Sequence, residues 1–110
     1  IETVRDDTGP YFASALASLA DHRLVGEVRT FGLLAAIELV KSKDGPVMFE
    51  DTGTVGGMCR DHAIQRGLMM RAVRDAMILS PALSYTRADI DETVAIARKA
   101  LDATATDLGL

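Results

Sequence analysis

Three segments of the chain repeat their apolar residues with the period of an α-helix. They are residues 10–21, 52–66 and 86–109. The last segment has the clearest start, because Thr86 is followed three residues later by Asp89, close to the pattern of a capping box. Its apolar stripe consists of Ile90, Val94, Ala97, Leu101, Ala105 and Leu108. For the middle helix we expect Asp51 or Thr52 as the N-cap.

The segment between the first two helices has the composition of a pair of strands. Residues 24–40 are rich in β-favouring residues and contain two glycines, which predicts two strands with a bend or bulge near residues 30–32. In the second of these strands, apolar residues alternate with the others. The positions expected to share one face are Leu33, Ala35, Ile37 and Leu39.

A second hairpin is predicted between the last two helices. Its strands are residues 68–73 and 76–79, and the turn is formed by Arg74 and Asp75, where Asp75 is available to pair with Arg74. The order helix, two strands, helix, two strands, helix predicts an α+β fold. In it, a small antiparallel sheet of about four strands is covered by helices.

Composition narrows the class of protein. The 110 residues carry 12 basic and 16 acidic side chains, a net charge of −4, without a basic face, so we expect no nucleic-acid partner. The apolar runs are too short to span a bilayer, and no signal peptide is recognisable. One cysteine excludes an internal disulfide. We therefore expect a single cytoplasmic domain over residues 1–110 that does not bind membranes.

Arg71 is the feature that the pattern does not explain. It lies in "GLMMRAVRDAMILSPAL", a stretch otherwise suited to burial, and the two-residue turn places it opposite Ile78. A guanidinium is costly to bury without an anion. Two interpretations remain: Arg71 reaches solvent from an edge strand, or it binds a negatively charged partner. Composition by itself favours the first.

The other reactive side chains fit structural roles. Cys59 and His62 are three residues apart on one helix face, but two ligands do not make a zinc site, so we expect no metal. A Cys–His nucleophile pair has no charge nearby that would stabilise a thiolate. The methionines expected to fill the core are Met58, Met69, Met70 and Met77.

Three blocks, in order, resemble the C-terminal small domain of class III (omega-type) aminotransferases, enzymes of fold type I that use pyridoxal phosphate. They are "VGEVRTFGLLAAIELV", "GLMMRAVRDAMILSPAL" and "TRADIDETVAIARKAL". The resemblance covers nearly the whole chain from about Gly9. It implies that residues 1–110 are a fragment of a larger, homodimeric enzyme whose cofactor-binding large domain is absent.

The resemblance also implies a role for Arg71. It matches the arginine that in many members of the family binds the substrate carboxylate, and a planar guanidinium suits two carboxylate oxygens. The sequence departs from the family pattern at Thr30, Phe31, Arg74 and Ala82. Arg74 replaces a glycine, so if this position requires a positive φ, arginine costs roughly 1 kcal/mol there.

The expected activity belongs to the parent enzyme. By resemblance, the parent transfers an amino group between an amine or amino acid and a keto acid such as pyruvate. Lys41, Lys43 and Lys99 occupy polar positions that do not suit a Schiff-base amine. We therefore expect the fragment alone to be inactive, with no catalytic residue and no cofactor of its own. The alternatives are a fragment of an aminomutase of the same fold, and a non-catalytic domain that binds a partner.

Overall fold

The chain folds into one antiparallel sheet with helices packed against it. The computed structural model describes residues 4–41, 43, 49, 53–80 and 85–109. The helical segments are a π-helical turn η1 (Val4–Thr8), α1 (Gly9–Ala17), a 3-10 turn η2 (Ser18–Asp21), α2 (Thr54–Gln65) and α3 (Arg87–Asp107). The strands are β1 (Val25–Phe31), β2 (Leu34–Leu39), β3 (Arg71–Val73) and β4 (Ala76–Leu79). This order confirms the predicted α+β fold.

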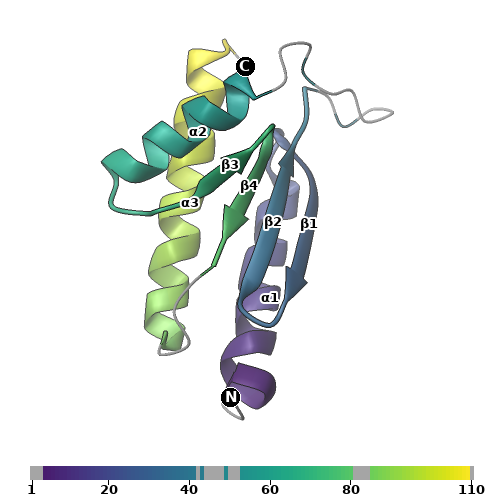
Figure 1. Cartoon of the computed structure of the whole chain (residues 1–110), viewed down its shortest axis with the longest axis vertical. Coiled ribbons are helices and arrows are strands. Elements are labelled where there is room, and N and C mark those ends of the chain that lie inside the picture. Colours follow the sequence, from purple (N-terminus) through teal and green to yellow (C-terminus); the bar gives the residue numbers. More distant parts are fainter. Residues whose placement is uncertain (1–3, 42, 44–48, 50–52, 81–84, 110) are drawn as a thin grey trace.

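The sheet has the strand order β1-β2-β4-β3, and all neighbours are antiparallel. Figure 1 shows α1 and α3 behind the sheet, and α2 lies against α3 beside the β3–β4 hairpin. One face of the sheet is therefore covered by helices, and the face toward the viewer in Figure 1 is open. β3 is an edge strand, because it pairs only with β4.

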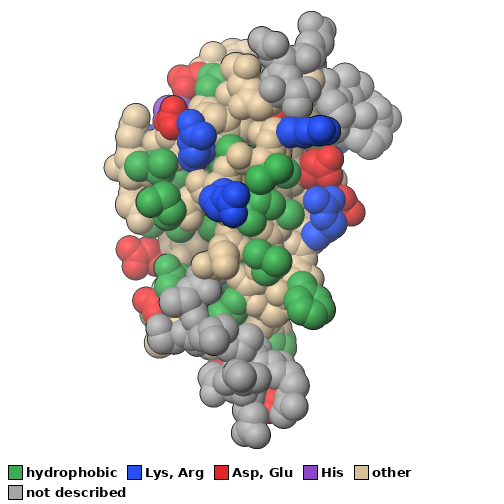
Figure 2. Space-filling view, in the orientation of Figure 1, with side chains coloured by type: hydrophobic (Ala, Val, Ile, Leu, Met, Phe, Trp, Pro, Cys, Tyr) green, Lys and Arg blue, Asp and Glu red, His purple; other side chains and the backbone are tan. Residues whose placement is uncertain are grey.

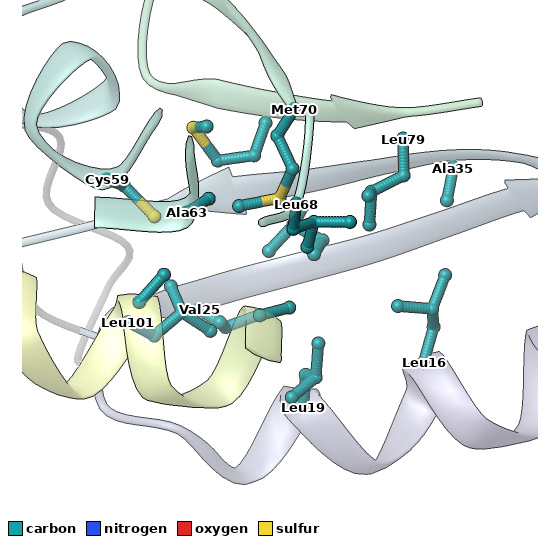
Figure 3. Close-up of a cluster of buried hydrophobic side chains, with 14 of the residues drawn as sticks. Leu16, Leu19, Val25, Ala35, Cys59, Ala63, Leu68, Met70, Leu79 and Leu101 are labelled. Carbon is teal, nitrogen blue, oxygen red and sulfur yellow. The ribbon is translucent and has the colours of Figure 1, made fainter. Parts of the chain in front are cut away.

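The alternation along the second strand of the first hairpin decides which face is covered. Ala35, Ile37 and Leu39 are each at most 2% exposed, whereas Leu34 between the hairpin turn and this row is 51% exposed. The predicted shared face is therefore confirmed, including Leu33 at 7% exposure. Figure 3 shows side chains from sheet and helices meeting in the covered layer. Among the labelled ones are Leu16, Leu19, Ala35, Cys59, Ala63, Leu79 and Leu101.

The last helix matches its sequence signals. The Thr86 side chain accepts a hydrogen bond from the Asp89 backbone N–H, and the Asp89 carboxylate accepts one from the Thr86 N–H, so the capping box is complete. Four residues of the predicted stripe are buried, and Val94 and Leu108 pack against the core in part. The buried side also includes Thr104, whose hydroxyl donates to the Ala100 carbonyl at 2.7 Å. No helix in the described ranges is long and apolar enough to cross a membrane.

Two local predictions were wrong. The edge strand begins at Arg71 and not at residue 68, because the preceding residues approach the sheet without pairing. Met69 is 77% exposed, so it is not core filler. The bend expected near residues 30–32 is present as a two-residue turn at Gly32 and Leu33, and β1 has a further register irregularity between Val25 and Glu27.

The middle helix is shorter than predicted. It begins at Thr54, and Gly53 is its N-cap. The predicted caps, Asp51 and Thr52, lie outside the described residues. A glycine has no side chain to accept a hydrogen bond from the first turn of the helix, so the cap must come from elsewhere in the fold.

Candidate substrate-binding surface

The open face of the sheet, defined as the outward-facing residues of the four strands, is the candidate site. Figure 2 shows hydrophobic side chains gathered over the strands on this face, with basic side chains among them. Its most exposed large apolar residues are Phe31 (86%), Leu34 (51%) and Val73 (50%), and Met69, two residues before β3, is 77% exposed. Exposed apolar residues that cluster with charges are typical of surfaces that contact another molecule or domain.

Strand register places two arginines on one row across this face. Arg71 is opposite Ile78, Ile78 is opposite Ala36, and Ala36 is opposite Arg29. The predicted partner of Arg71 across the hairpin is therefore confirmed. Because residues directly opposite each other in a sheet point to the same face, both guanidinium groups rise from the open face, with two apolar residues between them.

The two arginines differ in their electrostatic surroundings. The Nη1 atom of Arg29 donates to Glu27 Oε2 at 2.6 Å and to Glu38 Oε2 at 3.1 Å. The hydrogen bond to Glu27, followed by that to Glu38, raises the pKa of Arg29 above its ordinary value. Arg71 is also exposed, yet none of the residues that the structure describes accepts a hydrogen bond from its guanidinium. Arg71 is therefore the arginine of this row that can receive an external anion.

A shallow apolar hollow adjoins the row. It has a volume of about 240 Å³ and is lined by Arg29, Thr30, Phe31, Leu34, Ala35, Ala36 and Ile78. Ile78 is the residue opposite Arg71, so the hollow and the free guanidinium share a neighbour. A site that combines apolar walls with a single directional charge suits a small molecule bearing one carboxylate.

The turn of the second hairpin consists of Arg74 and Asp75, and the Asp75 carboxylate points away from the open face. Arg74 has φ 56°, which confirms that this position requires the left-handed conformation. Asp75 is 3% exposed, and its Oδ1 atom accepts the backbone N–H of Gly53 at 3.1 Å and of Gly56 at 2.9 Å. The expected pairing of Asp75 with Arg74 is therefore wrong. The carboxylate instead caps the start of the middle helix, whose own N-cap is a glycine.

Cys59 and His62 do not form a reactive pair. Cys59 is fully buried, and burial raises the pKa of its thiol to about 11, although a hydrogen bond with Thr104 lowers it in part. The Nε2 atom of His62 lies 2.6 Å from Asp107 Oδ2, which joins α2 to α3. Among the described residues, no three metal-binding side chains are grouped together.

The sequence had not indicated Asp75 as a cap, because its partners come 19 and 22 residues earlier.

Comparison with known proteins shows that the chain is similar to aminotransferases. No family model matches the sequence. The chain is 50% identical over 105 residues to the putrescine–pyruvate aminotransferase of Pseudomonas aeruginosa, a match covering 96% of the chain and 23% of that protein. It is 33% identical over 99 residues to the diaminobutyrate–2-oxoglutarate transaminase of Halomonas elongata, covering 87% and 21%. The chain thus spans less than a quarter of either relative.

Solved structures show the same fold. A thermostable omega transaminase from Pseudomonas jessenii superposes with a TM-score of 0.90 and 32% identity, over 97% of this chain and 24% of that one. A transaminase from a study of ancestral reconstruction superposes with a TM-score of 0.88 and 39% identity, over 94% and 23%. The likeness therefore covers both hairpins and all three helices of the described structure.

Proposed function

We propose that this chain is the C-terminal small-domain segment of a class III (omega-type) aminotransferase, because its homologues are enzymes of that family. The enzyme would transfer an amino group between an amine or amino acid and a keto acid such as pyruvate, as a cytoplasmic homodimer. The name of the Pseudomonas aeruginosa relative, at 50% identity, supports putrescine and pyruvate as the first substrates to test.

The segment contributes no attachment point for the cofactor. Pyridoxal phosphate supplies the electron sink for transamination when it is bound. Its Schiff base requires an amine that is shielded from water, and all three lysines of the sequence, Lys41, Lys43 and Lys99, are exposed. We therefore assign cofactor attachment to the remaining part of the enzyme and expect residues 1–110 alone to be inactive.

Arg71 carries the proposal for this segment. It stands on an edge strand with a guanidinium that the described residues leave unpaired, beside an apolar hollow whose wall includes Ile78. A charge-assisted hydrogen bond contributes about 1.5–3 kcal/mol, and a two-point pair with a carboxylate lies near the top of that range. Arg71 would thus hold the carboxylate of the amino or keto acid and orient the substrate toward the reacting centre.

The test compares two arginines in the full-length enzyme. Arg71→Ala should lower kcat/KM for alanine or pyruvate by roughly tenfold to a few hundredfold, since 1.4 kcal/mol is a factor of ten. Putrescine has no carboxylate and should lose much less in its half-reaction. Arg71→Lys should recover only part of the loss, because an ammonium cannot make the planar two-point contact.

Arg29→Ala is the matched control. Arg29 stands on the same row of the open face but is neutralised by two glutamates, so its removal should leave the ratio of the two half-reactions unchanged. Equal losses for carboxylated and uncarboxylated donors in Arg71→Ala would mean that Arg71 is a structural edge-strand residue. The proposed role in carboxylate binding would then be withdrawn.

A further inference from the structure

The second hairpin is held at its tip by a buried carboxylate. Asp75 is 3% exposed, and its Oδ1 atom accepts the backbone N–H groups of Gly53, the N-cap of α2, and of Gly56 in the first turn of that helix. Its backbone carbonyl accepts the N–H of Leu39 at 2.8 Å. The tip of the β3–β4 hairpin is therefore bonded both to the start of α2 and to the end of β2, which lie together in Figure 1.

Close packing reinforces these bonds. A Cβ atom at Gly56 would lie 2.2 Å from the Arg74 carbonyl oxygen, so the helix and the hairpin turn approach backbone to backbone. The helix is itself fixed to its neighbour, because His62 on α2 bonds to Asp107 on α3. The tip thus rests on an element that cannot shift freely.

The edge position of β3 makes this contact important for Arg71. β3 is three residues long and pairs on one side only, and Arg71 lies four residues before Asp75. In the described structure, no strand pairs with the outer side of β3, so backbone pairing holds it from one side only. We infer that Asp75 is a positioning residue for Arg71: by capping α2 it fixes the hairpin tip and so the direction in which the guanidinium leaves the sheet. This inference rests on the proposed role of Arg71.

The experiment measures the same ratio of half-reactions in the full-length enzyme. Asp75→Ala removes the acceptor of both N–H groups, and it should lower kcat/KM for alanine relative to putrescine on the order of tenfold, because small displacements of a binding group are costly. Asp75→Asn keeps a neutral oxygen acceptor, so it should shift the ratio in the same direction by about twofold to fivefold.

A double-mutant cycle separates positioning from a general loss of structure. In an Arg71→Ala background, Asp75→Ala should no longer change the ratio, because the group that it positions is gone. Thr86→Ala is the matched control. It removes the cap at the start of α3, which is the end of that helix opposite to Asp107 and its bond to α2, and it should reduce thermal stability without changing the ratio.

The outcomes distinguish the two proposals. If Arg71→Ala does not discriminate against carboxylated substrates, the proposed function itself fails, whatever Asp75 does. If Arg71→Ala discriminates but Asp75→Ala lowers both half-reactions equally, or keeps its effect on the ratio without Arg71, the positioning role is overturned. Should Asp75→Ala not fold, an unchanged ratio in Asp75→Asn would overturn it instead.

Discussion

The two hairpins of the sheet have the same strand pairing but are built in opposite ways. The β1–β2 hairpin turns at Gly32, where an added Cβ would meet nothing within 4 Å, and its outward arginine, Arg29, is neutralised by two glutamates. The β3–β4 hairpin turns at a non-glycine residue in the left-handed region, and its tip is docked on α2. Its outward arginine, Arg71, is left unpaired by the described residues.

The two hairpins also differ in how their turns are held in place. The first hairpin neutralises Arg29 with its own two glutamates, and its turn residue Leu33 is buried in the core. The second hairpin exposes a free cation and tolerates backbone strain at Arg74, and it is anchored through the buried Asp75. Strained backbone persists where the surroundings hold it in place, and such places are frequently functional. Substitutions at the contact with α2 and at the two turns can therefore test whether the second hairpin is the anchored one.

The largest effect is expected at the contact between helix and hairpin. Gly56→Ala should reduce the free energy of unfolding by about 2–3 kcal/mol, because the new methyl group would lie 2.2 Å from a backbone oxygen that cannot rotate away. Chemical denaturation would measure it. Gly57→Ala is the control, since its nearest neighbour is the end of the Arg60 side chain at 3.8 Å. Equal stability of the two variants would contradict close docking of the hairpin on α2.

A smaller effect, dependent on pH, is expected from Cys59 on the same helix. Burial raises the pKa of its thiol from 9.0 to about 11, so between these values the unfolded chain has lost the proton and the folded one keeps it. Stability should therefore fall as pH rises above about 9. The contribution of this thiol should make the free energy of unfolding roughly 1 kcal/mol lower at pH 10 than at pH 8.

Cys59→Ala isolates this contribution, because other groups also titrate in that range. The stability difference between pH 8 and pH 10 should be smaller in the variant than in the unchanged protein. An identical difference in both would show that the thiol between α2 and α3 is reached by water, and the support that α2 gives the second hairpin would then be looser than the structure indicates.

The smallest effects are expected at the two turns themselves. Gly32 has φ 60° and Arg74 has φ 56°, so both positions require a positive φ. Gly32→Ala should destabilise the protein by about 1 kcal/mol, whereas Arg74→Gly should stabilise it by about 0.5–1 kcal/mol, since glycine adopts this conformation without steric cost. Thermal unfolding of both variants would show opposite signs; a loss of stability in Arg74→Gly would mean that the arginine side chain itself supports the turn.

Local signals in the sequence predicted most of the elements. The capping box at Thr86, the alternation through Ile37 and the turn at Arg74 each depend on residues that are close along the chain. Local propensity and periodicity were enough there. The pairing of Arg71 with Ile78 followed from the turn length alone, because a two-residue loop fixes the register of a hairpin.

Predictions failed where a partner came from a distant part of the chain. The sequence indicated that Asp75 could pair with Arg74. The start of α2, however, has N–H groups without a side-chain cap of its own, and the Asp75 carboxylate accepts hydrogen bonds from them. Met69 looked apolar enough for the core, yet the helices cover only one face of the sheet and leave it at 77% exposure.

The sequence by itself determined the order of the elements, the buried face of the second strand, and the position of a lone arginine in an apolar stretch. Only the tertiary structure decided which arginine remains free. Arg29 and Arg71 are equally charged and equally placed in outward strand positions, but strand pairing brings Glu38 to Arg29, and helix packing takes Asp75 away from the second hairpin's surface. Charges separated along the chain are neutralised or exposed according to what the fold places within a few ångströms of them.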